Sequence, residues 1–245
     1  LTQMALTLFV AAPVILLALG FTLLRRPRAA TSTSAQLDFP IALRLHGRQV
    51  LMVGAGPISE RRVQQLLEVG AHVHVVAPQA TKLISELAAA GKLRWSQRAF
   101  EESDCAEPLI AFAATNDRSV NAAVYAAAHR FGHLANAADD PELCDFYVPS
   151  IGREGPITIA VSTAGLAPSL GAHLRTRLLK SVSAGDARLA QLIGRLRRII
   201  PGGRRRSAAF QSLIEGDAAR LLEQGDRRGL DQLLRTATAS KESGQ

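Results

Sequence analysis

The chain has few residues of the kinds that build metal centres, disulfide frameworks or base-stacking surfaces. Its 245 residues include two cysteines, Cys105 and Cys144, and six histidines. Neither residue type shows metal-ligand spacing, so we expect no metal site and two free or buried thiols. Aromatic residues make up 4% of the chain. They are not interleaved with basic residues, which argues against nucleic acid as a partner.

Negative charge does not balance positive charge at either end of the chain. The formal net charge is +8, and residues 1–37 contain three arginines and no acid. Residues 183–245 carry 12 basic and 7 acidic residues, whereas residues 38–182 carry 14 of each. The positive excess can be a solvated helical surface, or it can attract a polyanionic substrate or anionic lipid.

Charge is also absent from residues 4–24, which are almost wholly apolar. A run of about 20 such residues can span a bilayer as a helix. The Arg25-Arg26-Pro27-Arg28 segment follows at once, and positive charge favours the cytoplasmic side. We therefore predict an inner-membrane anchor in residues 1–24, a linker in 25–37 and a cytoplasmic remainder. Because the chain begins with Leu1, a misplaced start or a fragment boundary is the alternative origin of this segment.

The most informative segment is residues 50–78. An apolar run ends at Gly54-Ala55-Gly56, an amphipathic helix follows to Gly70, and a second apolar run covers residues 73–76. This order is typical of a dinucleotide-binding βαβ unit. Gly54 permits the tight turn, Gly56 lets the backbone approach a pyrophosphate, and the helix N-terminus offers free N–H groups. An ordinary βα turn is the alternative.

Two positions depart from the usual dinucleotide fingerprint. The third small residue is Ser59, which still allows close packing of the helix. The second strand ends in Ala77-Pro78-Gln79 without the acid that would hold a ribose 2′-hydroxyl. The pattern therefore leaves NAD and NADP open.

The remaining pattern predicts an α/β fold with three parts. Residues 38–148 form a Rossmann-like parallel sheet, in which strands 109–114 and 134–138 end at Thr115 and Asp139. Strands 146–151 and 157–162, joined by a turn at 152–156, form with a helix from Pro168 a small module of residues 149–182. Residues 183–245 form a helical domain with a polar tail.

Six motifs in a fixed order resemble one known family. They are FPI (39–41), VGAGPISERR (53–62), AATND (113–117), NAADDP (136–141), FYVPSI (146–151) and AVSTAGLAP (160–168). Together they resemble the precorrin-2 dehydrogenase/sirohydrochlorin ferrochelatase family, which includes the N-terminal module of siroheme synthase. The resemblance covers residues 38–182 well and residues 183–245 loosely.

The resemblance implies NAD-dependent dehydrogenation of precorrin-2 to sirohydrochlorin in siroheme biosynthesis, and in some members ferrous iron insertion, a lyase reaction. It implies a homodimer formed through residues 149–182. The family's catalytic aspartate falls on Asp139, and its regulatory serine falls on Thr163. Its cofactor contacts, beside Gly54 and Gly56, fall on Pro57, Ile58, Pro78, Gln79 and Thr115.

A tetrapyrrole substrate carries many carboxylates, so cationic side chains near the site are candidate partners. These are Arg153 in the predicted turn, and Arg175, Arg177 and Lys180 on the following helix. Arg175 and Arg177 lie on different helix faces and cannot reach one group. For Asp139 the alternative role is a turn cap before Pro141.

Two rival functions remain at this point. One is a membrane-tethered, NAD-sensing regulatory domain without catalysis. The other is a reductase of a different carbonyl substrate, for which the sequence offers no Tyr-x-x-x-Lys pair.

Overall fold

The computed structural model describes residues 38–239. The predicted anchor (1–24) and linker (25–37) lie outside the described residues, as does the end of the polar tail (240–245). Within residues 38–239, no helix is both long enough and apolar enough to cross a membrane.

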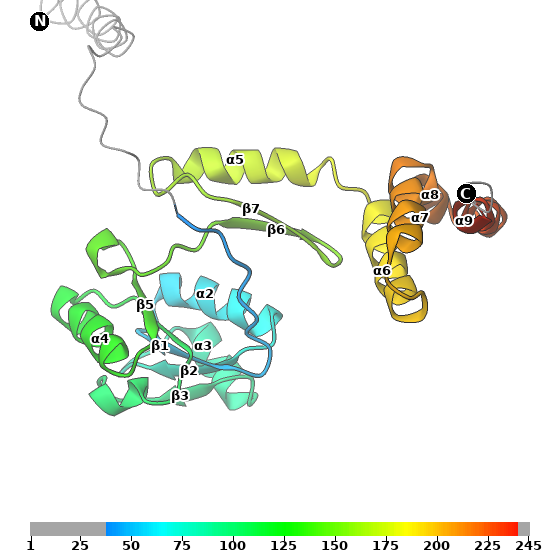
Figure 1. Ribbon diagram of the computed structural model, residues 1–245. Helices are drawn as coiled ribbons and strands as arrows, with labels where there is room; N and C mark the ends of the chain where they lie inside the picture. Colours follow the sequence, from blue (N-terminus) through cyan, green and yellow to red (C-terminus); the bar gives the residue numbers. More distant parts are fainter. Residues whose placement is uncertain (1–37, 240–245) are drawn as a thin grey trace, which may run out of the picture. The chain divides into compact units, whose positions relative to one another are not determined.

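A five-stranded, fully parallel sheet forms the first part of the described chain (Figure 1). The strand order is β3-β2-β1-β4-β5. The strands are β1 (Gln49–Val53), β2 (His72–Val76), β3 (Arg94–Ser96), β4 (Ile110–Ala113) and β5 (Leu134–Ala137). Strand order reverses between β1 and β4, and ligands of such sheets bind at that point, outside the carboxyl ends of the strands. The predicted Rossmann-like sheet is confirmed.

Helices cover both faces of this sheet. Helices α2 (Pro57–Glu68) and α3 (Lys82–Ala89) pack on one face, while α4 (Arg118–Arg130) and a 3₁₀ turn (Glu102–Cys105) pack on the other. Alternate residues of β1 pack into the cores on the two faces of the sheet, and because both faces are buried, its apolar run is continuous.

Both cysteines are free thiols, as predicted. Cys105 is buried beneath α4, and burial raises its pKa to about 11. Burial also raises the pKa of the half-buried Cys144. Both side chains are therefore mainly uncharged thiols at neutral pH.

The predicted hairpin exists, but its bounds were wrong. The antiparallel pair is β6 (Ser150–Glu154) and β7 (Ile157–Val161), so the turn is Gly155-Pro156 rather than residues 152–156. Gly155 has φ 53°, and glycine followed by proline suits a two-residue hairpin turn. Phe146 does not start the strand, because it packs edge-on against Phe112 of β4 at a centroid distance of 5.5 Å.

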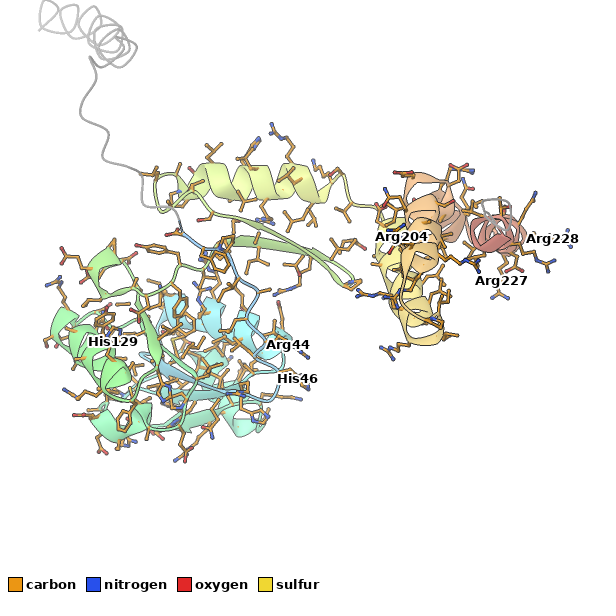
Figure 2. The ribbon with its side chains drawn as sticks, viewed as in Figure 1. Arg44, His46, His129, Arg204, Arg227 and Arg228 are labelled. Atoms are coloured by element: carbon orange, nitrogen blue, oxygen red, sulfur yellow. The ribbon has the colours of Figure 1, made fainter. Side chains whose placement is uncertain are left out.

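Helix α5 (Pro168–Leu179) packs against both strands of the hairpin, as the predicted helix from Pro168 required. The helical domain has its own small core around Leu189, Leu213 and Ala218. Its helices are α6 (Ala184–Ile199), α7 (Arg204–Glu215), α8 (Ala218–Gln224) and α9 (Arg227–Ala239). Figure 2 shows Arg204 at the start of α7, and Arg227 and Arg228 at the start of α9.

Candidate functional site

The glycine turn after β1 is built against the end of β4. Gly54 has φ 97°, and a Cβ at this position would lie 2.5 Å from the Ala114 carbonyl oxygen. Only glycine fits both the backbone conformation and the space. The turn therefore lies directly beside the backbone of Ala114 and Thr115, where strand order reverses.

Gly56 has the opposite surroundings. It is the N-cap residue of α2, no side chain caps the helix, and a Cβ built on it would meet no atom within 4 Å. Pro57 occupies the first turn, where a missing N–H costs nothing. The first-turn N–H groups therefore face open space at the positive end of the helix dipole, which fits a pyrophosphate.

Ser59 explains how α2 comes so close to the sheet. Its side chain is fully buried, and within the described part of the chain its Oγ has no hydrogen-bond partner. The position thus selects a small residue for packing and makes no use of the hydroxyl.

The end of β2 is joined to the same turn. The Gly54 N–H donates to the Val76 oxygen at 3.0 Å, and the Thr81 N–H donates to the Ala55 oxygen at 3.0 Å. Pro78 and Gln79 are exposed between these contacts. The structure thus brings the predicted residues of β1 and β2 together at one edge, and Gln79 offers an amide where other dinucleotide folds have an acid.

Thr115 lies beyond β4 and is held by Asn121, a residue that the sequence reasoning missed. The Thr115 N–H donates to Asn121 Oδ1 at 3.2 Å, and Asn121 Nδ2 donates to the Thr115 oxygen at 3.2 Å. Asn121 is only 5% exposed. The available signal was its position three residues before Val124, which places it on the buried face of the helix.

Asp139 lies just beyond the end of β5 in a conformation unusual for a non-glycine residue, with φ 61°. It is exposed, and its carboxylate makes no hydrogen bond or ion pair with any residue in 38–239. The turn-capping alternative is not realised, since the 3₁₀ turn Pro141–Leu143 begins after Asp140 and has no side-chain cap.

Asp140, by contrast, forms an ion pair with Arg118. Its Oδ2 accepts from Arg118 Nε at 2.7 Å, and its side chain is 14% exposed. The guanidinium of Arg118 is 3.5 Å from Glu142 as well. Of the two adjacent carboxylates, that of Asp139 alone has no side-chain partner within residues 38–239.

The segment after Asp139 is tied back to β5. Asn136 Nδ2 donates to the Phe146 oxygen at 2.8 Å, and Asp145 Oδ2 accepts from the Ala135 N–H at 2.8 Å. His129 on α4 (Figure 2) places Nε2 2.8 Å from the same Asp145 oxygen. These contacts fix where the chain leaves and re-enters the sheet around Asp139.

The predicted cationic residues differ in their contacts. Arg153 is 3.4 Å from Glu68, and Arg175 Nε is 3.4 Å from Ser150 Oγ, with its stem over Gly152. Arg177 is exposed. The two arginines of α5 thus differ in surroundings, as their spacing predicted. Among residues 38–239, no group of three His, Cys, Asp or Glu side chains could hold a metal ion.

Known proteins share both the sequence and the fold. A family model described as "Putative NAD(P)-binding" matches residues 41–150. The siroheme synthase of Methylococcus capsulatus (strain Bath) is 39% identical over 199 residues, which is 80% of this chain and 42% of the relative. The siroheme synthase of Nitrosococcus oceani is 36% identical over 202 residues, which is 81% of this chain and 43% of the relative. The solved structure of "SirC, precorrin-2 dehydrogenase" is 26% identical, has a TM-score of 0.65, and is covered along 100% of its length by 81% of this chain.

The chain is thus similar over most of its length to siroheme synthases and to a precorrin-2 dehydrogenase. It spans less than half the length of the siroheme synthases that it matches. In this chain, the glycine turn, Thr115 and Asp139 all lie beyond the carboxyl ends of neighbouring parallel strands, β1, β4 and β5.

Proposed function

We propose that the protein dehydrogenates precorrin-2 to sirohydrochlorin with NAD. The observation that carries the proposal is the exposed, unpaired Asp139 carboxylate, near a glycine turn suited to a dinucleotide at the same edge of the sheet. Dehydrogenation removes a hydride and a proton from the substrate. When bound, NAD supplies the hydride acceptor, and the net change is precorrin-2 plus NAD⁺ to sirohydrochlorin, NADH and a proton.

The chain's own residues have two tasks in this reaction. Gly54, Gly56 and the first turn of α2, with Pro57 and Ile58, hold the pyrophosphate, while Pro78, Gln79 and Thr115 border the remaining cofactor. The Asp139 carboxylate accepts the proton from the substrate carbon as general base. Its lack of any partner among the described residues leaves both oxygens free to do so.

Recognition of the substrate carboxylates falls to arginines of the hairpin module. Arg177 is exposed and Arg175 is half-buried. Arg153 would exchange its weak, exposed pairing with Glu68 for a substrate carboxylate. If ferrous iron is a second substrate, the four tetrapyrrole nitrogens would bind it, and Asp139 would accept the two displaced pyrrole protons one after the other, releasing each to solvent.

Two further proposals concern assembly. Residues 149–182 form the homodimer contact, which is supported by three exposed leucines in this module, Leu166, Leu170 and Leu178. Sedimentation of the chain as a monomer at micromolar concentration would contradict this.

Residues 4–24 attach the chain to the inner membrane, and extraction of the full chain by carbonate would contradict that proposal.

The deciding experiment supplies precorrin-2 and NAD⁺ to the chain without oxygen. We expect NADH and the absorbance of sirohydrochlorin to appear together, in equal amounts. An NAD-sensing regulatory domain would bind NAD⁺ without forming either product. A separate assay with sirohydrochlorin and ferrous iron tests iron insertion.

A further inference from the structure

The neighbours of the Thr115 hydroxyl decide whether it can donate or accept a hydrogen bond with a ligand. The orientation of the Asn121 amide follows from the backbone, because Oδ1 faces the Thr115 N–H and Nδ2 faces the Thr115 oxygen. The flipped amide would set donor against donor and acceptor against acceptor. Asn121 Oδ1 is thus an acceptor located 2.7 Å from Thr115 Oγ1.

A hydroxyl has one hydrogen and two lone pairs. The hydrogen of Thr115 has two acceptors within reach, Asn121 Oδ1 at 2.7 Å and the Asp117 backbone oxygen at 3.0 Å. Whichever acceptor receives it, the hydrogen is used inside the protein. The Asp117 N–H donates to one lone pair at 3.2 Å. The hydroxyl can therefore offer a ligand only a single lone pair.

The start of α4, next to Thr115, also presents hydrogen-bond acceptors. The Asp117 carboxylate caps this helix by accepting from the Ser119 N–H at 2.8 Å and from its hydroxyl. These hydrogen bonds lower the pKa of Asp117, so a negative charge occupies the position where an anion would otherwise bind. Phosphate is disfavoured here, in contrast to the uncapped start of α2.

We infer that Asn121 fixes the Thr115 hydroxyl as a hydrogen-bond acceptor toward the dinucleotide, and that the cofactor group beside it is a neutral donor. Three groups of NAD have this chemistry: a ribose hydroxyl, the adenine 6-amino group and the carboxamide NH₂. The inference rests on the proposed function, because it takes NAD as the ligand. Asn121 is in this view a positioning residue, and Thr115 is the residue that selects the donor.

The test measures dissociation constants by calorimetry for NAD⁺ and for 3-acetylpyridine adenine dinucleotide, whose acetyl group lacks the carboxamide donor. Thr115→Val should weaken NAD⁺ binding by about three- to tenfold, as expected for one neutral hydrogen bond. Thr115→Ser should restore it. Thr158→Val, on the exposed face of β7, is the matched control. If the carboxamide is the donor, Thr115→Val should leave affinity for the analogue unchanged. If a ribose hydroxyl or the adenine amine is the donor, Thr115→Val should weaken the binding of both ligands by the same factor.

Asn121→Ala keeps the Thr115 hydroxyl and removes the amide that orients it. It should change the dissociation constants of NAD⁺ and the analogue in the same pattern as Thr115→Val, with thermal unfolding recording any loss of fold. The inference is overturned if Thr115→Val binds NAD⁺ within twofold of the unaltered chain, or if Thr115→Ser binds as poorly as Thr115→Val. If the unaltered chain binds no NAD⁺ at all, the cofactor assignment of the proposed function has failed instead.

Discussion

Asp139 and Asp140 offer a matched pair of substitutions at adjacent positions. In each, Asp→Asn replaces one carboxylate oxygen by an amide nitrogen and leaves the size of the side chain unchanged. Asn also tolerates the left-handed backbone of residue 139 (φ 61°), whereas a residue such as Ala would add about 1 kcal/mol or more of strain. Loss of activity in Asp139→Asn can therefore be assigned to the lost base.

The expected magnitudes differ by more than tenfold. Loss of a general base lowers the rate by about a hundredfold or more, which corresponds to about 2.7 kcal/mol of activation free energy. Asp140→Asn weakens an ion pair whose Arg118 side chain is 72% exposed. Such a pair contributes at most about 1 kcal/mol to the free energy of unfolding. Its loss should change turnover by less than about threefold.

The assay follows NADH formation from precorrin-2 at saturating NAD⁺, with NAD⁺ affinity measured separately. Asp139→Asn should bind NAD⁺ normally, since the glycine turn holds the phosphates. Equal losses of turnover in the two variants, or normal turnover in Asp139→Asn, would refute the assignment. If Asp139→Asn also stops iron insertion, one carboxylate serves both reactions.

Three further predictions rest on local structure. Gly56→Val should weaken NAD⁺ binding by tenfold or more, because the side chain enters the open space above α2; Gly194→Val, which also projects into open space, is the calorimetric control. Ser59→Ala should raise the free energy of unfolding by about 1 kcal/mol in urea titration, because it removes a buried hydroxyl with no partner in the described part of the chain; a loss of stability would show that the hydroxyl is satisfied. Burial alone would raise the pKa of Asp104, but hydrogen bonds from Arg98 and the Glu101 N–H outweigh it and lower the pKa. Asp104→Asn should therefore cost about 1–2 kcal/mol of stability at pH 7, and the difference should vanish as the pH falls below about 4, through the lowered pKa; a constant difference at all pH values would contradict this reasoning.

The parallel sheet could be predicted because its signals are local. A continuous apolar run marks each central strand, and a glycine or an apolar helix face marks the segment after it. The hairpin bounds could not be predicted in this way. Phe146 and Val148 alternate like strand residues, yet both pack against the buried core of the sheet. Their place was decided by a tertiary contact with Phe112 that no local pattern contains.

The candidate site was predictable to a different degree in each part. The glycine turn follows from two residues whose roles are set by backbone geometry, and in the structure Gly54 lies against the Ala114 backbone while Gly56 borders open space. The role of Asn121 was not predictable, because it depends on a hydrogen bond to a loop six residues earlier. Nor could the sequence say which of Asp139 and Asp140 is paired, since Arg118 lies 22 residues before its partner.

The two helix starts at this edge of the sheet have opposite electrostatic characters. The start of α2 has no side-chain cap and borders open space, so it attracts phosphate. The start of α4 is capped by the Asp117 carboxylate, and Thr115 beside it presents only a lone pair. A dinucleotide carries a doubly charged pyrophosphate between two nucleosides that each bear neutral donors, so these two helix starts favour the pyrophosphate over α2 and the donors of one nucleoside toward α4. That orientation directs this nucleoside of the cofactor toward the β4 and β5 side of the sheet, and the Asp139 carboxylate lies just beyond the end of β5.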